Sequence, residues 1–219
     1  MAGENRSNVE QRVLQAAKQV LFARGFHNSS LRAIAKKAGT SESGVLRFYQ
    51  GKLHLLQCVF ASCWTEINDR LDKVLAAEVK KDPDPRNLLL EVARFILEEY
   101  QAEEPMMHFM LYHFGFEDTA GYTPQDDADT DADTEARRQY RRYLLRINDL
   151  CDAVVAENGA FAAAGINGDA LANLFLGIVA GIPARWYGAR LEPGLARPQL
   201  TIDEALRGIK LFLYQEAAG

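Results

Sequence analysis

Side chains able to bind an anionic surface are concentrated in residues 30–52 of this 219-residue chain. This segment contains serine and threonine hydroxyl groups as well as the cations Arg32, Arg47 and Lys52. Hydroxyls, guanidinium groups and ammonium groups donate hydrogen bonds to phosphate oxygens, and hydroxyls and guanidinium groups also bind the edges of bases. The candidate binding residues of this segment are Ser30, Arg32, Thr40, Ser41, Glu42, Ser43, Gly44, Arg47, Phe48 and Lys52.

The elements that must position these side chains have the pattern of two short helices joined by a tight turn. Ser30 is expected to cap a helix over residues 31–38. Gly39 can adopt the positive φ that ends such a helix, and Ser41 can cap a following helix over residues 42–48. This arrangement is a helix-turn-helix, in which the N-terminal part of the second helix enters the major groove of DNA.

The inner side of this pair is predicted to hold Ile34, Ala35 and Val45 against a preceding helix at residues 8–24. Arg47 then lies on the outer side, where it could hold a guanine through two hydrogen bonds or hold a phosphate. A purely structural domain of three helices is the alternative.

The other outward residues have distinct predicted roles. Ser43 can donate or accept at a base edge or a phosphate, and Gly44 allows a close approach. Phe48 could touch a thymine methyl group. Arg32 and Lys52 point toward the phosphate backbone, and the amides at the start of the helix that Lys52 opens could bind the same phosphates.

The charge of the chain is divided unevenly. Residues 1–55 contain nine Lys or Arg and three Glu, a net charge of +6. The remaining residues contain 16 basic and 27 acidic side chains, a net charge of −11. A basic first quarter on an acidic body favours contact between the N-terminal part and a polyanion, with chance surface charge as the alternative.

Four motifs follow one another at fixed spacing in the same region. They read RVLQAA at 12–17, LFARGF at 21–26, IAKKAGTS at 34–41 and GVLRFY at 44–49, with Lys52 after them. In order and spacing they resemble the N-terminal signature of the TetR family of bacterial transcriptional regulators. The resemblance implies a homodimer of all-helical subunits, each with a three-helix DNA-binding head and a ligand-binding body whose last two long helices form the dimer interface. It also implies regulation, most often repression, that a small molecule releases.

The chain departs from the family pattern at several positions. Leu46 stands where the family usually has a tyrosine that contacts a phosphate, and Leu31 stands where a threonine is common. Leu53 replaces the usual acidic residue after the lysine. The phosphate contacts are therefore expected to differ from those of the family, with a larger share made by Arg47 and Lys52.

Apolar residues recur at helical spacing through most of the chain, without an alternating strand pattern of useful length. We expect an all-α fold of about nine helices, with a homeodomain-like head in residues 1–52 and a ligand-binding and dimerisation body in residues 53–219. The acidic residues 121–135 are expected to form a solvated loop, and Pro183 to end or kink its helix. Helical segments beyond the head are expected at about residues 51–80, 88–96, 106–116, 140–154, 168–189 and 202–216.

Two apolar segments near the C-terminus predict a homodimer. One recognition helix contacts only a few base pairs. Two copies related by a two-fold axis would double these contacts and would bind a near-palindromic operator in double-stranded DNA. Residues 171–182 combine large apolar side chains with small ones that permit close packing, and with the last helix they could form an intersubunit four-helix bundle. A helix of the subunit's own core is the alternative. The candidate interface residues are Leu171, Leu174, Phe175, Ile178, Ile209, Phe212 and Leu213.

Aromatic and methionine side chains in the body predict an adaptable apolar pocket for an unidentified small-molecule effector. Ordinary core packing is the alternative for each of them. The candidate lining residues are Trp64, Phe95, Tyr100, Met106, Phe109, Met110, His113 and Phe116.

Other chemistry finds little support in the sequence. No catalytic motif is present, so neither an enzyme nor a cofactor is expected. A metal site combining His108 and His113 with Cys58 or Cys63 is disfavoured, because histidines five residues apart do not share a helix face. The acidic run lacks the glycine and the terminal glutamate of a calcium-binding loop.

The composition favours a cytoplasmic protein. There is no stretch of about 18 apolar residues and no hydrophobic signal region at the N-terminus. Three cysteines, an odd number, fit a reducing compartment. The sequence therefore predicts a dimeric DNA-binding regulator, foremost a repressor that a small, largely apolar ligand releases. A ligand sensor whose head does not read DNA is the alternative, and an enzyme is a more distant one.

Overall fold

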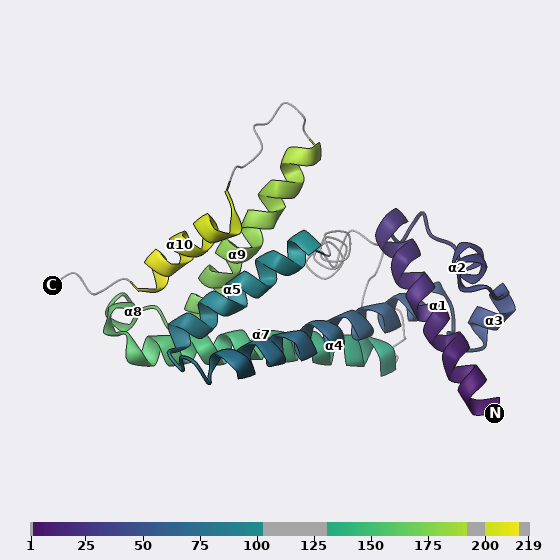
Figure 1. Ribbon diagram of the computed structural model, residues 1–219, viewed down its shortest axis with the longest axis horizontal. Helices are drawn as coiled ribbons and strands as arrows, with labels where there is room; N and C mark the ends of the chain where they lie inside the picture. The colour runs from purple at the N-terminus through teal and green to yellow at the C-terminus, as the bar shows by residue number, and fades with distance from the viewer. Residues whose placement is uncertain (1, 103–130, 192–199, 215–219) are drawn as a thin grey trace. The chain divides into compact units, whose positions relative to one another are not determined.

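The computed structural model describes residues 2–102, 131–191 and 200–214. Within these ranges the chain forms nine α-helices and no strand, which confirms the predicted all-α fold. No helix in the same ranges is both long and apolar enough to cross a bilayer. The helices are α1 (Ala2–Arg24), α2 (Leu31–Ala38), α3 (Glu42–Leu46), α4 (Lys52–Glu78), α5 (Pro85–Ala102), α7 (Asp131–Glu157), α8 (Gly159–Ala163), α9 (Gly168–Leu191) and α10 (Ile202–Leu213) (Figure 1).

The described residues belong to two compact units. The first contains residues 2–67 and 131–141, and the second contains residues 68–102, 142–191 and 200–214. The division falls inside α4 and inside α7. The domain boundary suggested by the sequence at residue 52 stays a prediction.

Side-chain caps define the short helices of the first unit. The Ser30 hydroxyl accepts a hydrogen bond from the amide of Ala33 at 3.1 Å and starts α2. Gly39 ends α2 with φ of +67°, a left-handed conformation that glycine adopts without the strain of a Cβ atom. The Ser41 hydroxyl accepts from the amide of Gly44 at 3.0 Å and starts α3. All three caps were predicted from the sequence and are confirmed.

Apolar burial fixes α3 within this unit. Ile34, Ala35 and Val45 are almost completely inaccessible to solvent, as the sequence predicted. Helix α2 contacts both α1 and α3, so the three helices form one cluster (Figure 1). Because Val45 points into this cluster, the opposite side of α3 must face outward.

Several predicted boundaries were wrong. Helix α3 ends at Leu46 rather than at residue 48, where the amide of Phe48 donates to the carbonyl of Val45 three residues earlier, as in a 3₁₀ turn. Helix α7 includes residues 131–135 of the expected loop of residues 121–135, where Ala132 and Glu135 are residue types that favour helix. Residues 121–130 of that loop lie outside the described residues.

Two further features of the C-terminal helices add to the sequence-based picture. Helix α9 continues through Pro183 to Leu191, so Pro183 does not end it, and the kink that was the other expectation stays a prediction. The short helix α8 was not predicted. It starts at Asn158, whose side chain accepts from the amide of Ala160 at 3.0 Å.

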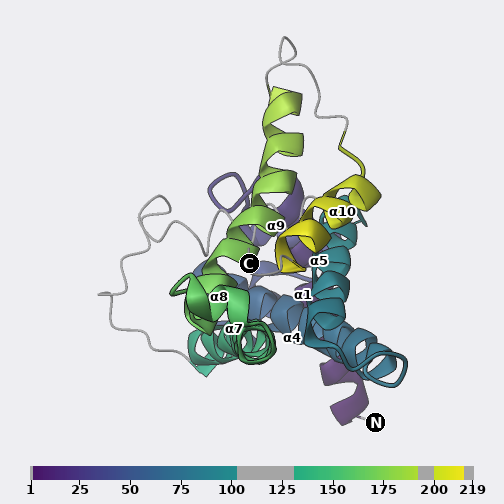
Figure 2. The same ribbon diagram turned by 90° about the vertical axis from the view of Figure 1, so that its left-hand side faces the viewer.

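Helices α5, α9 and α10 contact one another and build the core of the second unit (Figure 2). Leu89 of α5, Phe175 of α9 and Leu213 of α10 are fully buried there. Helix α10 starts with a capping box in which Thr201 and Glu204 each bind the other's backbone amide. The second unit thus has an apolar core of its own.

Ion pairs connect the helices of the second unit around this core. Asp72 of α4 binds Arg142 of α7 at 2.8 Å and also binds Arg146. Arg146 in turn donates to the side chain of Asn68 at 2.8 Å. These ion pairs and this hydrogen bond attach the second half of α4 to α7.

Candidate nucleic-acid interface

The outward side of α3 presents four side chains. Glu42, Ser43, Leu46 and Arg47 are all exposed, whereas Val45 is fully buried. At 3.6 residues per turn, Leu46 projects between Glu42 and Ser43, and Arg47 projects next to Ser43. Arg47 is the C-cap but keeps right-handed helical dihedrals, so it continues the same arc. We call these four residues the α3 arc.

The turn before α3 holds the helix closely. The hydroxyls of Ser41 and Ser43 are 2.9 Å apart and share a hydrogen bond. A Cβ atom added to Gly44 would come within 2.3 Å of the Thr40 hydroxyl oxygen. Gly44 therefore permits close packing within the head, and its predicted role in the approach of DNA stays a prediction.

The residues that follow α3 are partly inside the head. Phe48 is half-buried, with its ring centroid 6.4 Å from that of Tyr49. Tyr49 is buried and its hydroxyl donates to the carbonyl of Glu10 in α1 at 3.3 Å. Burial raises the pKa of Tyr49 well above its ordinary value. Phe48 thus offers less free surface than the sequence suggested, whereas Tyr49 attaches this segment to α1.

Lys52 makes contacts inside the head. Its ammonium group donates to the carbonyl of Ser29 at 2.9 Å and lies 4.1 Å from the centroid of the Phe26 ring. Burial lowers the pKa of Lys52. The Ser29 hydroxyl donates to the carbonyl of Gly25 at 2.6 Å, so Lys52 completes a network that fixes the loop before α2. Sequence reasoning missed Phe26 and Ser29 because their partner lies more than 20 residues away in the chain.

His54 and Cys58 form a small polar group at the start of α4. The Nδ1 atom of His54 accepts from the amide of Gln50 at 3.1 Å, and its Nε2 atom lies 3.7 Å from the Cys58 sulfur. Burial and the nearby carboxylate of Glu10 raise the pKa of Cys58 to about 11. Among the described residues, no group of three or more His, Cys, Asp or Glu side chains could hold a metal ion. His108 and His113 lie outside these residues.

The basic side chains of the head fall into two sets. Lys18 is buried and binds Glu66 of α4 at 2.5 Å, and Lys52 is bound to the loop before α2. Most of the others remain open to solvent. The exposed cations of the described head are Arg12, Arg24, Arg32, Lys36, Lys37 and Arg47.

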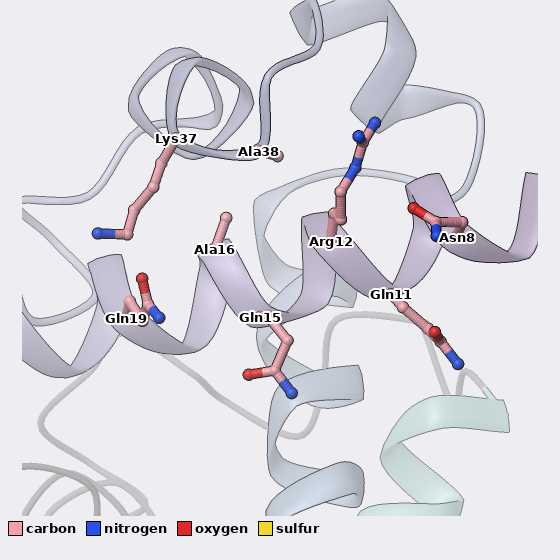
Figure 3. A pocket seen from close by; sticks show the side chains of 8 residues that line it. All are labelled: Asn8, Gln11, Arg12, Gln15, Ala16, Gln19, Lys37 and Ala38. Carbon is pink, nitrogen blue, oxygen red and sulfur yellow. The ribbon is translucent and has the colours of Figure 1, made fainter. Parts of the chain in front are cut away.

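A polar hollow of about 400 Å³ lies along α1 and the end of α2 (Figure 3). The buried Ala16 and Ala38 line it, and the side chains of Arg12 and Lys37 border it together with four carboxamides. None of its eight lining residues is acidic. The hollow therefore adds to the basic character of the head.

The predicted pocket residues are only partly within the described chain. Trp64 is buried in the first unit, with its ring centroid 4.8 Å from that of Tyr140. Phe95 and Tyr100 are buried in the second unit. The remaining candidates, Met106, Phe109, Met110, His113 and Phe116, lie outside the described residues. The apolar pocket stays a prediction.

The predicted dimer residues divide into three groups by burial. Leu171, Phe175, Ile209 and Leu213 are buried within the chain's own second unit. Phe212 is half-buried and packs edge-on against Phe161 at 5.9 Å. Leu174 and Ile178, by contrast, are 46% and 38% exposed on one face of α9.

Comparison with known proteins agrees with the geometry of the head. Residues 13–59 match the family model described as bacterial regulatory proteins, tetR family. Over 52 residues the chain is 42% identical to the HTH-type transcriptional regulator SrpR of Pseudomonas putida. This match covers 24% of the chain and 24% of SrpR, so it spans about a quarter of each protein.

Solved structures resemble almost the whole chain in fold. The MbdR regulator from Azoarcus sp. CIB gives a TM-score of 0.64 at 17% identity, covering 94% of this chain and 96% of that one. The regulator FadR from Bacillus subtilis, in complex with stearoyl-CoA, gives 0.62 at 13% identity, covering 93% and 96%. At these identities the likeness concerns the fold alone.

The matched region and the two capped helices α2 and α3 together define a helix-turn-helix head. The match over residues 13–59 confirms that the sequence motifs resemble those of the tetR family of bacterial regulatory proteins. That family is described as regulatory proteins and the relative SrpR as a transcriptional regulator, in agreement with the expectation that the chain is not an enzyme.

The contacts of Lys52 predict that its substitution weakens the head itself. Lys52→Met removes the hydrogen bond to Ser29 and the cation from the Phe26 ring, at an expected cost of about 1–2 kcal/mol in the free energy of unfolding. Urea titration followed by circular dichroism measures this cost. Lys37→Met, at an exposed lysine of α2, is the control and should leave stability unchanged. Equal stability of the two variants would show that Lys52 does not stabilise the head, and would leave phosphate contact as its role.

Proposed function

We propose that this chain regulates transcription by binding a near-palindromic DNA operator as a homodimer and by releasing it when a small, largely apolar effector binds. The observation that carries the proposal is the α3 arc, which presents Ser43 and Arg47 outward beside Glu42 and Leu46 from a capped helix whose Val45 is fully buried. The comparison with the tetR family concerns residues 13–59 of the head, whereas the proposed activity is that of the whole chain.

The arc suits direct reading of the major groove. In a helix-turn-helix, residues near the N-terminus of the second helix contact base edges while the preceding helix crosses the backbone. Ser43 can accept or donate at a base edge, and the Arg47 guanidinium can hold a guanine or a phosphate. Ser30 and Arg32 at the start of α2 then face the phosphates, as do the amides at the start of α4. The exposed cations of the head are attracted electrostatically to the DNA phosphates, and this attraction does not depend on the base sequence.

Arg47→Ala should weaken operator binding strongly. The loss of one charged contact predicts a decrease in affinity of about tenfold or more, and wild-type affinity should fall steeply with salt. A fluorescence-anisotropy titration at several salt concentrations, with duplexes enriched by the wild-type protein from a random DNA library, measures both effects. Arg138→Ala, which removes an exposed arginine paired with Glu135 in α7, is the control. An affinity unchanged in Arg47→Ala would contradict the role of the arc.

The exposed face of α9 is the proposed dimer interface. Leu174 and Ile178 lie one helical turn apart on this face. Gly177 and Gly181 are exposed beside them, with no atom near the position of an added Cβ, so a second helix can approach closely. Leu211 is largely exposed on α10. The predicted interface residues that are buried in the subunit would support this face from beneath.

A charge at the centre of this face should separate the subunits. Ile178→Asp places a carboxylate in an apolar contact, and we expect a monomer at micromolar concentration with much weaker operator binding. Sedimentation velocity measures the oligomeric state. Leu145→Asp, at an exposed leucine of α7, is the control and should remain dimeric. A dimeric Ile178→Asp would exclude this face as the interface.

The effector is proposed to be largely apolar and bulky. The apolar character of the predicted pocket residues supports this, as does the shared fold of FadR from Bacillus subtilis, which is bound to stearoyl-CoA. Acyl-CoA thioesters, whose acyl chain is the apolar part that such a pocket would hold, are therefore the first compounds to test. An active thioester should weaken operator binding about fivefold or more. Unchanged affinity with thioesters of short, medium and long acyl chains would contradict this effector class.

A second candidate, a sensor whose head does not read DNA, is favoured by one observation. Leu46, where the family usually has a phosphate-binding tyrosine, lies in the middle of the arc and cannot form a hydrogen bond. Failure of the wild-type protein to enrich any duplex from a random library would support this function instead.

A further inference from the structure

We propose that Leu46 determines sequence specificity by packing against the C5 methyl group of a thymine in the operator. This inference rests on the proposed function and names the chemical group that one residue of the α3 arc recognises. It differs from the sequence-based expectation, in which Phe48 makes such a contact.

The position of Leu46 is the first argument. It projects between Glu42 and Ser43, near the middle of the arc, and 51% of its surface is exposed. Its neighbour Val45 is completely buried and anchors the helix from the opposite side. A DNA surface that contacts the exposed side of α3 therefore also contacts Leu46.

The chemistry of the groove is the second argument. Leu46 has no hydrogen-bonding group in its side chain, so neither a phosphate nor a base edge gains a hydrogen bond from it. The one apolar group that the major groove displays is the thymine methyl. Contact with this methyl removes apolar surface from water on both partners, and cytosine, guanine or adenine at the same place offers no equivalent.

The rigidity of α3 is the third argument. Its start is fixed by the Ser41 cap, and the Thr40 hydroxyl fills the space beside Gly44 that a Cβ atom would take, so the helix packs closely on the turn before it. Phe48, the competing apolar residue, is half-buried and follows the end of the helix. Leu46 therefore has a defined position from which to contact one methyl group in each half-site.

The test replaces thymidine by deoxyuridine, which pairs identically with adenine and lacks only the methyl group. Duplexes enriched by the wild-type protein are resynthesised with one symmetric pair of thymidines replaced at a time. At one such pair we expect the affinity to fall about fourfold for each lost methyl contact. Fluorescence anisotropy at constant salt measures the change.

Protein variants then assign the effect to the residue. Leu46→Ala should bind the unmodified duplex more weakly by a similar factor and should no longer respond to deoxyuridine at that position. Leu46→Gln, with a longer side chain that favours helix, should behave in the same way. Leu53→Ala is the matched control, because Leu53 is 40% exposed but belongs to the first turn of α4. It should keep the wild-type response.

Two results would overturn the inference while the proposed function stands. In the first, the wild-type protein binds its duplex tightly and no deoxyuridine replacement changes the affinity. In the second, Leu46→Ala and Leu46→Gln keep the full response, so that another residue contacts the methyl group. If no duplex is enriched at all, the proposed function fails and the inference fails with it.

Discussion

The orientation of α3 depends on the burial of one side chain, Val45. A helix of five residues cannot persist on its own in water, because its nucleation cost exceeds what so few hydrogen bonds return. Val45 places it in the apolar cluster with Ile34 and Ala35, and the caps at Ser41 and Arg47 satisfy its ends. The outward direction of the arc follows from this anchor, and the base contacts proposed for DNA follow from the arc.

The positive charge of the head serves two purposes. Lys18 and Lys52 are used internally, the first to bind Glu66 of α4 and the second to hold the carbonyl of Ser29. The cations that stay exposed are available to a polyanion. A simple count of basic residues therefore overstates the charge that DNA would meet, since part of it stabilises the scaffold that presents the rest.

Local signals made the head predictable from the sequence, whereas long-range contacts were not. Ser30, Gly39 and Ser41 act on residues only a few positions away, so their types and spacing sufficed. Lys52 contacts a loop more than 20 residues earlier, and no pattern in the chain indicates that pairing. For α9, the helical periodicity identified which residues are apolar. It could not distinguish those buried in the subunit core from the exposed Leu174 and Ile178, because all of them belong to one nearly continuous apolar segment.

The brevity of α3 has an evolutionary consequence. Five residues at 1.5 Å each extend about 7.5 Å, roughly two base-pair steps of duplex DNA. In the proposed function, recognition by one copy of the head thus depends on very few side chains, of which Glu42, Ser43 and Leu46 are exposed and carry no part of the hydrophobic core. Gene duplicates of such a protein can acquire new target sequences through one or two codon changes without loss of folding, so regulatory circuits built on this head can diverge quickly.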